Sequence, residues 1–444
     1  LILASIARDK GFEVAYVDSE NEPLSFEETL RTIKAHSPDV LAFSLTTPYV
    51  RIFNQQLPAL RKELPTTVFI AGGPHPSARR EDIFNDVPFV DLAVYGEGEI
   101  AFSRFLDHLL GNISLDQVPS LLYRGVNGLP ALTAQAPIIQ DLDSIPYPAY
   151  DLVQHLIAKY PATFPSRAKP SIHIMATRGC PYKCTYCSNA VFGASIRMRS
   201  AEHVIREIEY LVDNLGVREV FFQDDTLNCS PDYFFSLCNL LIARGLNRKA
   251  MYKVVFRANK TLVSPELLAK AKEAGVWMIF YGVESGDPEM LRRICKGITL
   301  DELKRAFLLT RQAGIKTHAS LMIGNLGETR ETIAKSYDLL TEILPDTFCF
   351  SIAYPFPGTR FYDLVIEQNL MYPHTDFVAD RYPWIGISRT EALDKDEIRY
   401  EKEVVQLKTI DYLASEQGIL RIHKQYSDAG REDLWQENLY FHRN

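Results

Sequence analysis

The stretch IHIMATRGCPYKCTYC, residues 172–187, joins a short apolar run to a loop that contains three cysteines. The run 172–177 has the length and composition of a buried strand, and turn-forming residues follow it directly. Parallel α/β sheets place their active sites in the loops that follow the carboxyl ends of the strands. We therefore expect Cys180, Cys184 and Cys187 to lie at the mouth of a parallel α/β sheet.

The three cysteines have the spacing C-x3-C-x2-C, so one tight loop can turn all three sulfurs toward one point. Thiolates bind soft metals such as zinc, copper(I) and the iron of iron–sulfur clusters. A structural zinc site is closed by four protein ligands, and no further Cys or His follows at the spacing of a zinc finger. The pattern favours an iron–sulfur cluster with one open coordination position, and structural zinc is the alternative.

Further strand-like runs follow, with helical stretches between them, as expected of βα repeats. They are residues 217–224, 252–258, 276–284, 316–324 and 348–355. Two of the helices have recognisable starts. Ser264 and Pro265 provide a cap and a first-turn proline, and Thr299 begins a capping box with Glu302. The pattern predicts a partial (β/α)6 barrel over residues 171–360, three quarters of a closed eightfold one.

Residues 1–125 show the same alternation of strands and helices. The strand-like runs are residues 13–18, 40–45, 67–73 and 91–96. Residues 25–36 carry apolar side chains at helical spacing. The alternation predicts a doubly wound, Rossmann-like parallel sheet, whose opening strand we expect to be absent because the sequence starts inside a helix. Residues 126–170 contain seven prolines and are expected to form a linker.

The composition of the 444 residues is that of a globular protein, with 46% hydrophobic and 23% charged residues. The net charge is -8 and no dense block of Lys and Arg occurs, which argues against nucleic acid as the main ligand. No apolar run approaches the roughly 18 to 20 residues that span a bilayer. Seven cysteines, an odd number with three clustered, fit metal binding in a reducing compartment, so we expect a cytoplasmic protein.

The segment RGCPYKCTYC resembles the cluster loop of radical S-adenosylmethionine (SAM) enzymes. In that family three cysteines hold a [4Fe–4S] cluster, and SAM chelates the fourth iron through its amino and carboxylate groups. The resemblance assigns Cys180, Cys184 and Cys187 as the metal ligands and extends over the partial barrel. It also implies the following SAM-contacting residues: Asp224, Arg257, Glu284, Ser285, Ile323 and Tyr354.

Each of these residues also has a simpler interpretation. Asp224 and its neighbour Asp225 could cap the next helix, and Arg257 could be a surface ion-pair partner. Glu284 is harder to explain in that way, because a carboxylate at the end of an apolar strand in a barrel mouth is costly unless it is paired or bound to a ligand. The turn 322–329 departs from the family pattern, with Asn325 and Leu326 in place of Leu-Pro.

The amino-terminal segments SLTTPYV, GGPHP and GEGE resemble, in order and spacing, the cobalamin-binding domain that precedes the barrel in one branch of the family. A dinucleotide site is disfavoured, because no G-x-G-x-x-G joins a strand to a helix. Small side chains would let the backbone approach the corrin ring. The resemblance implies these cobalamin-binding residues: Ser44, Thr46, Tyr49, Gly72, Gly73, His75, Gly96 and Glu97. The D-x-H-x-x-G motif is absent, and His75 is expected to be a loop hydrogen-bonder rather than a cobalt ligand.

The resemblance implies a cobalamin-dependent C-methyltransferase that uses a 5′-deoxyadenosyl radical and methylcobalamin on an unactivated carbon. The alternatives are a non-methylating cyclase or rearrangement enzyme and a corrinoid-binding carrier or sensor, and the cysteine loop argues against the last. Expected partners are a small-molecule or peptide substrate and an electron donor of the flavodoxin or ferredoxin type. A mostly helical cap is expected over residues 361–436, with Arg381, Tyr382 and Trp384 near the substrate. ENLYF, residues 437–441, resembles a protease recognition sequence added by engineering, although His442 stands where such a sequence has Gln, and residues 437–444 are therefore set aside from the fold.

Overall fold

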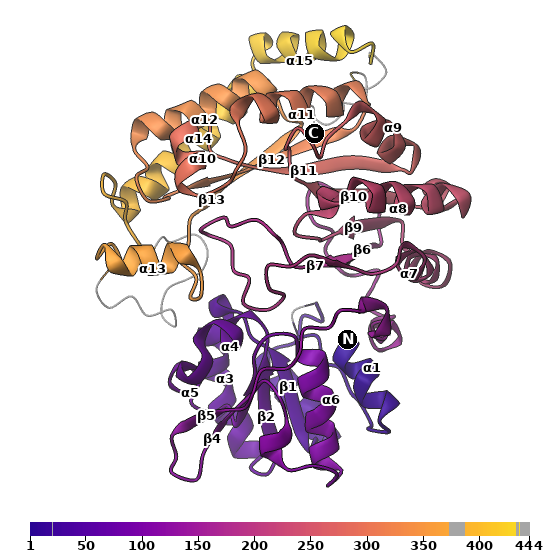
Figure 1. Cartoon of the computed structure of the whole chain (residues 1–444), viewed down its shortest axis with the longest axis vertical. Helices are drawn as coiled ribbons and strands as arrows, with labels where there is room; N and C mark the ends of the chain where they lie inside the picture. Colours follow the sequence, from indigo (N-terminus) through magenta and orange to yellow (C-terminus); the bar gives the residue numbers. More distant parts are fainter. Residues whose placement is uncertain (20, 373–386, 432–434, 436–444) are drawn as a thin grey trace.

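The computed structural model describes residues 1–19, 21–372, 387–431 and 435 of the chain. They form two α/β units, and the segment around β7 (Thr177–Arg178), which leads into the three cysteines, lies between them (Figure 1). The expected residues Arg381, Tyr382 and Trp384 and the segment 437–444 lie outside the described residues.

The amino-terminal sheet has the strand order β1-β2-β3-β4-β5. The strands are β1 (Val40–Ser44), β2 (Val68–Gly72), β3 (Leu92–Val94), β4 (Leu121–Arg124) and β5 (Pro130–Leu132). The helices of this unit are α1 (Ile2–Asp9), α2 (Phe26–His36), α3 (Val50–Glu63), α4 (Pro74–Arg79), α5 (Ile83–Asp86) and α6 (Gly98–Leu109). The first three strands pair in parallel, and β4 and β5 add an antiparallel edge.

Helices cover both faces of this sheet because successive residues of a strand point to opposite sides. In β2, Phe69 and Ala71 pack with Val50 and Leu57 of α3. Ile70, between them, packs on the other face with helices α1 and α6. Coverage of both faces confirms the doubly wound architecture.

Two features of this unit differ from the expectation. Residues 13–18 form no strand, because no ladder of backbone hydrogen bonds joins them to a neighbour, and alternating apolar residues alone do not make a strand. The sheet also extends past residue 125 into the expected linker, because β5 pairs with β4. Segment 126–170 therefore contributes a strand to the sheet before it crosses to the barrel.

The second unit contains a curled six-stranded sheet, entirely parallel, with the order β13-β12-β11-β10-β9-β6. The strands are β6 (Ser171–Ile174), β9 (Glu219–Phe222), β10 (Met251–Phe256), β11 (Val276–Glu284), β12 (Lys316–Ile323) and β13 (Thr347–Ile352). The helices on its outer side are α7 (Ala201–Asn214), α8 (Pro231–Ala243), α9 (Pro265–Glu273), α10 (Pro288–Arg293), α11 (Leu300–Gln312) and α12 (Arg330–Ile343). The partial barrel is confirmed, as are the capped starts of α9 and α11.

A row of aromatic rings crosses the inner face of this sheet. Centroid separations are 5.3 Å from His173 to Phe221, 4.9 Å from Phe221 to Phe280 and 4.6 Å from Phe280 to His318. The alternate residues, such as Ile279 and Ala319, belong to the core under the outer helices. Burial lowers the pKa of His318 to about 4, so this imidazole is neutral at pH 7.

The carboxyl-terminal region is mostly helical, as expected. It contains α13 (Arg360–Glu367), α14 (Lys395–Ala414) and α15 (Glu416–Asp428). Helix α14 packs against α12 and the edge strand β13, and its Ile398 and Val405 enter the barrel core. The structure therefore places α14 on the wall of the partial barrel (Figure 1).

The segment after the first sheet wraps back onto the start of the chain. The Ser5 hydroxyl donates to the Tyr147 carbonyl at 2.6 Å, and Arg8 pairs with Asp151 at 2.7 Å. The amide of Ala149 donates to the carbonyl of Leu1 at 3.3 Å. These contacts join α1 to residues far along the chain. Across the ranges that the structure describes, no helix is both long and apolar enough to cross a membrane.

Candidate functional site

The main candidate site is a cavity of about 660 Å³ where the two units meet. The amino-terminal unit contributes the loop after β1 and the start of α4, and the barrel contributes the cysteine loop and the loop after β13. The lining residues are Thr46, Thr47, Pro48, Tyr49, Ile52, Pro74, Tyr186, Ser188, Phe356, Pro357 and Thr359. Carboxyl ends of strands from both sheets thus open onto one space.

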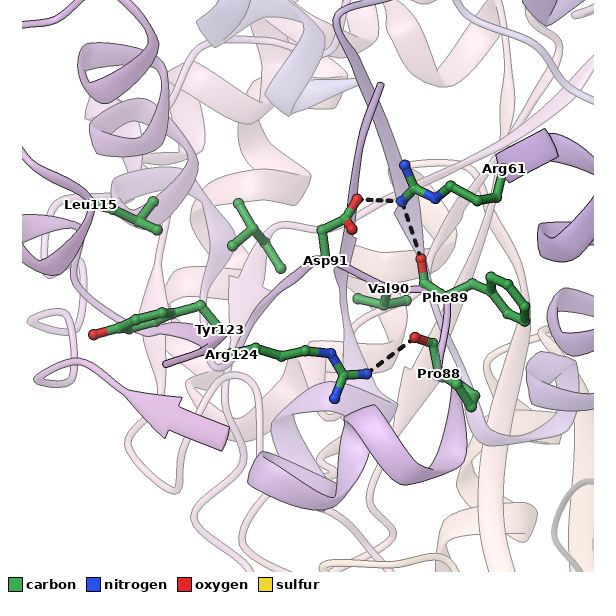
Figure 2. A pocket seen from close by; sticks show the side chains of 9 residues that line it. Arg61, Pro88, Phe89, Val90, Asp91, Leu115, Tyr123 and Arg124 are labelled. Carbon is green, nitrogen blue, oxygen red and sulfur yellow. Dashed lines mark hydrogen bonds and ion pairs between the residues drawn. The ribbon is translucent and has the colours of Figure 1, made fainter. Parts of the chain in front are cut away.

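A second pocket, of about 310 Å³, lies by the amino end of β3 and is lined by Arg61, Asp91, Tyr123 and Arg124 among others (Figure 2). Arg61 pairs with Asp91 there. Arg124 donates to the Pro88 carbonyl at 3.1 Å. Because these guanidinium groups already have protein partners and the pocket lies away from the cysteines, we do not place the function there.

The cysteine loop, residues 179–196, is closed at its base by a short antiparallel pair, β7 with β8 (Arg197–Met198). Gly179 begins the loop with a φ of +83°, a left-handed conformation that favours glycine. A Cβ at this position would also collide with the carbonyl oxygen of Ser195. The tight closure of the loop therefore requires glycine beside the first cysteine.

The three loop cysteines differ in exposure: Cys184 is buried, Cys180 is half-buried and Cys187 is exposed. The amide of Cys187 donates to the carbonyl of Cys184 at 3.1 Å, which makes a tight turn between them. A hydrogen bond from the Cys187 thiol lowers the pKa of Cys184, and the nearby cations Lys296 and Arg257 lower it further. These contacts favour the thiolate, the form that binds metal.

Within the described ranges, no three His, Cys, Asp or Glu side chains are arranged to hold a metal ion. Cys184 and Cys187 thus share one turn, whereas Cys180 Sγ lies 3.8 Å from the Thr226 hydroxyl, and the three thiols are not gathered around a single point. Of the four other cysteines, Cys238 lies in the core, Cys229 lies near Cys180, and Cys295 and Cys349 are exposed.

Asp224, after β9, anchors the strand end that leads into the cysteine loop. It accepts hydrogen bonds from the Ala176 amide at 3.0 Å and from the Thr177 hydroxyl at 2.6 Å. Burial raises its pKa to about 6. The next helix is capped by Ser230, so the helix-cap alternative for Asp224 is wrong.

Arg257, after β10, faces the cysteine loop and is only 7% exposed, which excludes a surface ion pair. Its guanidinium lies 3.5 Å from the centroid of the Tyr182 ring, and Nη1 lies 3.8 Å from Cys184 Sγ. It also donates to the carbonyl of Lys296. Arg257 thus supplies positive charge beside a cysteine.

Glu284 ends β11 with a φ of +64°, and the pairing with β12 shifts register between Gly282 and Glu284. Such bulges re-aim side chains next to active sites. The carboxylate pairs with Lys296 Nζ at 2.8 Å, and the same ammonium lies 3.3 Å from the Tyr186 hydroxyl. A Cβ on Gly282 would lie 2.5 Å from the Glu284 carboxylate, so the glycine leaves room for the ion pair.

Three other predicted SAM-contacting residues are buried. The Ser285 hydroxyl accepts from the Asp287 amide at 3.1 Å within the turn. Ile323 lies in the core between the sheet and the outer helices. The Tyr354 ring packs 4.7 Å from that of Phe356, which lines the cavity. Ser285 and Ile323 serve turn geometry and packing here, and Tyr354 supports the cavity wall.

On the amino-terminal side, Thr46 and Tyr49 line the cavity. Gly73 has a φ of +98°, and a Cβ there would lie 2.8 Å from the hydroxyl oxygen of Ser44. A Cβ on Gly72 would meet no atom within 4 Å. The loop after β2 is therefore closely packed at Gly73 and open at Gly72.

His75 and Glu97 do not line the cavity. His75 is buried, with Nδ1 3.0 Å from the Thr47 hydroxyl and Nε2 3.2 Å from Asp86. Nδ1 therefore has a hydrogen-bond partner, and Nε2 lies at ion-pair distance from the Asp86 carboxylate without a hydrogen bond. Gly96 donates its amide to Ser77 Oγ at 3.0 Å, and Glu97 faces the barrel, where it pairs with Arg178 and Arg197.

Two family models match the chain: the B12 binding domain over residues 1–106 and the radical SAM superfamily over residues 174–340. The uncharacterized methyltransferase PH0819 of Pyrococcus horikoshii is 32% identical over 373 residues, which is 83% of this chain and 78% of that protein. This chain belongs to the radical SAM superfamily, in the branch with a B12-binding domain. It is an enzyme of the cobalamin-dependent radical SAM methyltransferase type, which uses a [4Fe–4S] cluster, SAM and cobalamin.

Other similar proteins show that this branch is not uniform. The anaerobic magnesium-protoporphyrin IX monomethyl ester cyclase of Cereibacter sphaeroides is 28% identical over 388 residues, 85% of this chain and 62% of that protein. The solved structure of the cobalamin-dependent S-adenosylmethionine radical enzyme OxsB with aqua-cobalamin bound has a TM-score of 0.74 and 18% identity. It covers 97% of this chain and 68% of that chain, and it supports the fold alone.

The side chains of this radical SAM enzyme fit the cluster and SAM. Three thiols in one loop, with cations beside Cys184, suit an iron–sulfur cluster. The side-chain amide of Asn325 is 1% exposed, and neither its nitrogen nor its oxygen has a hydrogen-bond partner in the described part of the chain. A buried, unsatisfied amide is costly, so it fits a ligand with polar edges such as the adenine of SAM.

Lys296 is the residue of this site that the motifs did not reveal. It follows α10, outside any strand-end segment, and reaches Glu284 and the cysteine loop only through the fold. The one local signal was that Glu284, as a carboxylate in a barrel mouth, needed a partner.

Proposed function

We propose that this enzyme transfers a methyl group to an unactivated carbon of a small molecule or of a peptide or protein side chain. The observation that supports this proposal most is the shared cavity. Its walls come from the strand ends of the B12-binding domain and from the cysteine loop of the barrel. Radical formation and methyl donation need a common space from which water is excluded, and this cavity joins the two expected sites.

When bound, the cluster and SAM supply a 5′-deoxyadenosyl radical that abstracts hydrogen, and methylcobalamin supplies the methyl group. For each methyl transferred, the balanced reaction consumes two SAM molecules and two electrons. It yields one methionine, one 5′-deoxyadenosine and one S-adenosylhomocysteine. We propose that the electrons come from a flavodoxin-type or ferredoxin-type donor.

The residues of the chain divide these tasks. We propose that Cys180, Cys184 and Cys187 hold the cluster, and that Arg257 and Lys296 stabilise negative charge beside it. Glu284 is proposed to hold the ribose of SAM. The B12-binding domain would contact cobalamin through Ser44, Thr46, Tyr49, Gly72 and Gly73, where side chains are small or flat.

The test is anaerobic turnover of the loaded full-length enzyme with SAM that carries a trideuterated methyl group. Candidate substrates come from the classes used by similar enzymes: tetrapyrroles, lipids, peptides and antibiotic precursors. We expect a product that gains the labelled methyl, with deoxyadenosine and S-adenosylhomocysteine in about equal amounts. Deoxyadenosine alone, with a product of unchanged carbon count, would contradict methyl transfer.

A cyclase is the second candidate function, because cyclases occur among the similar proteins. A cyclase would make deoxyadenosine with little S-adenosylhomocysteine, and its product would lose hydrogen without gaining a methyl. The same experiment therefore separates the two functions.

A further inference from the structure

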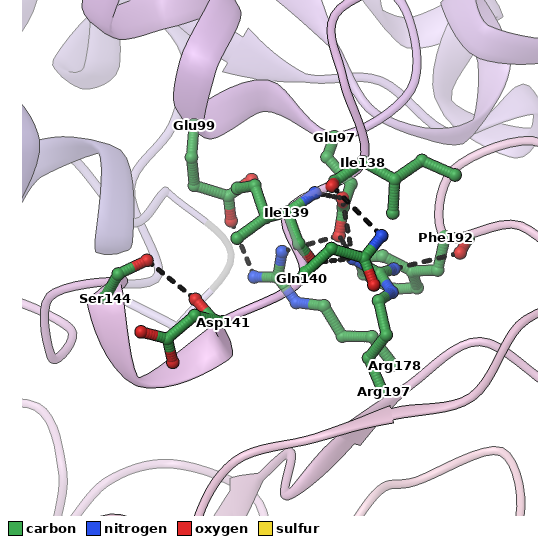
Figure 3. A network of polar contacts seen from close by, with 10 residues as sticks. All are labelled: Glu97, Glu99, Ile138, Ile139, Gln140, Asp141, Ser144, Arg178, Phe192 and Arg197. Carbon is green, nitrogen blue, oxygen red and sulfur yellow. Dashed lines mark hydrogen bonds and ion pairs between the residues drawn. The ribbon is translucent and has the colours of Figure 1, made fainter.

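Four charged side chains meet between the B12-binding domain and the base of the cysteine loop (Figure 3). Glu97 Oε1 lies 2.9 Å from Arg178 Nη1, and both Glu97 oxygens lie 2.9 Å from Arg197 Nη1. Glu99 Oε1 lies 2.6 Å from Arg178 Nη2. The four side chains are 5% to 12% exposed, so this is a buried, electrically balanced cluster.

The two arginines lie at the two ends of the cysteine loop. Arg178 and Arg197 are directly opposite each other in the β7–β8 pair that closes residues 179–196. One carboxylate, Glu97, therefore bridges both ends of the loop at its base. The two glutamates lie at the start of α6, which follows β3 of the B12-binding domain.

Further contacts tie the interior of the loop to the same cluster. The Arg178 guanidinium lies 5.0 Å from the centroid of the Phe192 ring, and Arg197 donates to the Phe192 carbonyl at 3.0 Å. Arg197 also donates to the Ile139 carbonyl at 2.6 Å, and the Ile139 amide donates to Glu97 at 3.2 Å. The crossing segment, the loop and the B12-binding domain thus share one network (Figure 3).

We propose that Glu97, Glu99, Arg178 and Arg197, here called the interdomain clamp, are positioning residues that fix the cysteine loop relative to the B12-binding domain. None of the four lines the cavity, so the clamp acts through the loop rather than on a substrate. Buried ion pairs contribute little to stability compared with apolar packing, but they can specify one arrangement. Planar arginine forks favour this role, because they restrict direction as well as distance.

The consequence is geometric and rests on the proposed function. If the cysteines hold the cluster and the B12-binding domain holds cobalamin, the clamp sets how the radical source and the methyl donor face each other. A misplacement of about 1 Å can cost two orders of magnitude in rate. A loosened clamp should therefore leave radical formation in place and impair methyl transfer selectively.

The test compares Glu97→Gln and Glu99→Gln with wild type in the full-length protein loaded with iron and cobalamin. Glu97→Gln removes the charge that pairs with both arginines. Glu99→Gln removes the charge that pairs with Arg178 alone, so it is the milder variant and serves as the test if Glu97→Gln fails to fold. Glu209→Gln is the control, because Glu209 makes an exposed 3.3 Å ion pair with Arg244 away from the loop. The readouts are amide hydrogen exchange of residues 179–196 and the ratio of deoxyadenosine to methylated product.

We expect exchange in the loop to accelerate about tenfold in Glu97→Gln and less in Glu99→Gln. The ratio of deoxyadenosine to methylated product should rise about fivefold, with iron and cobalamin content kept. Unchanged exchange, or an unchanged ratio, in both variants would overturn the clamp, as would equal changes in Glu209→Gln. If wild type makes no methylated product, the proposed function fails, and loop exchange alone still decides whether the clamp positions the loop.

Discussion

The two sides of the central cavity solve different recognition problems. On the barrel side the cavity wall is itself uncharged, but buried and paired charged groups lie behind it around the cysteine loop, such as Glu284 with Lys296 at 2.8 Å. On the side of the B12-binding domain, the wall consists of hydroxyl, proline and aromatic side chains, such as Thr46, Pro48 and Tyr49. His75 and Glu97 of that domain do not line the cavity, and their carboxylate and guanidinium partners lie outside its wall.

This difference matches the two ligands. A cluster and a sulfonium with charged ends need charges placed in advance, because in a buried site such groups cannot be supplied by water. A large, flat corrin needs close approach and an unobstructed surface. Charged side chains at the strand ends of the B12-binding domain can therefore be used for holding the other unit. The comparison predicts that charge changes harm the barrel side most and that added bulk harms the cobalamin side most.

The largest effect is expected on the barrel side. Replacing Cys180, Cys184 and Cys187 by Ala should abolish the brown colour and the content of about four irons per anaerobically reconstituted chain, because thiolates hold the cluster. Iron analysis and absorption spectra measure this. Cys295→Ala, an exposed outlying cysteine, is the control and should keep its iron. A colourless wild type with one zinc would contradict the assignment.

On the side of the B12-binding domain, the placement of cobalamin is tested by introducing a larger side chain. Gly73→Phe should lose bound cobalamin, because Gly73 has a φ of +98° and its side chain would meet Ser44. Asn112→Phe, which adds the same bulk at an exposed position past the end of α6, is the control and should keep it. The measurement is the cobalt-to-chain ratio after gel filtration, with circular dichroism to confirm folding. Full cobalamin content in folded Gly73→Phe would refute this placement.

On the barrel side, the role of charge is tested at the ion pair between Glu284 and Lys296. Glu284→Gln and Lys296→Met should each weaken SAM binding by about 10- to 100-fold, because charge-assisted hydrogen bonds are the strong ones. Deoxyadenosine and S-adenosylhomocysteine should both fall at subsaturating SAM. Lys249→Met, which breaks an exposed 2.8 Å pair with Asp213, is the control. Equal SAM affinity in all three variants would remove this pair from the site.

The smallest expected effect is on the free energy of unfolding and concerns His318, inside the barrel. Burial lowers the pKa of His318 to about 4, against an ordinary value of 6.5, so the unfolded state binds the proton more readily. The stabilisation is complete above pH 6.5 and is lost as pH falls toward 4. Between pH 7 and 5 the free energy of unfolding should fall by about 2 kcal/mol through this group. Urea titrations of His318→Asn should lack that part of the decrease, and an identical pH slope would contradict it.

The sequence predicted the sheets well, because long apolar runs such as 276–284 are sufficient to mark buried strands. It failed at residues 13–18, where the pattern is strand-like but no partner strand pairs with it. Strand formation depends on a neighbour as well as on composition, and the neighbour is a property of the fold.

At the site, residues with local signals were easier to place than those whose partners are distant. The cysteine loop is a contiguous motif and was identified from its spacing. Glu97 was expected at cobalamin because its motif follows a strand end. Its partners Arg178 and Arg197, however, lie 81 and 100 positions further along the chain. Lys296 has no motif at all. Both cases depend on tertiary pairing, which no local pattern encodes.

The contacts between α1 and the crossing segment have a consequence for how the chain is synthesised. Ser5 and Tyr147, which form a hydrogen bond, are 142 positions apart in the sequence. At about 5 to 20 residues per second, a ribosome releases the second partner on the order of ten seconds after the first. Until then, the apolar side of α1 can pack only within the B12-binding domain, against α6. During that interval the first unit lacks these contacts, and the barrel, whose first strand begins at Ser171, is synthesised only after the residues that make them.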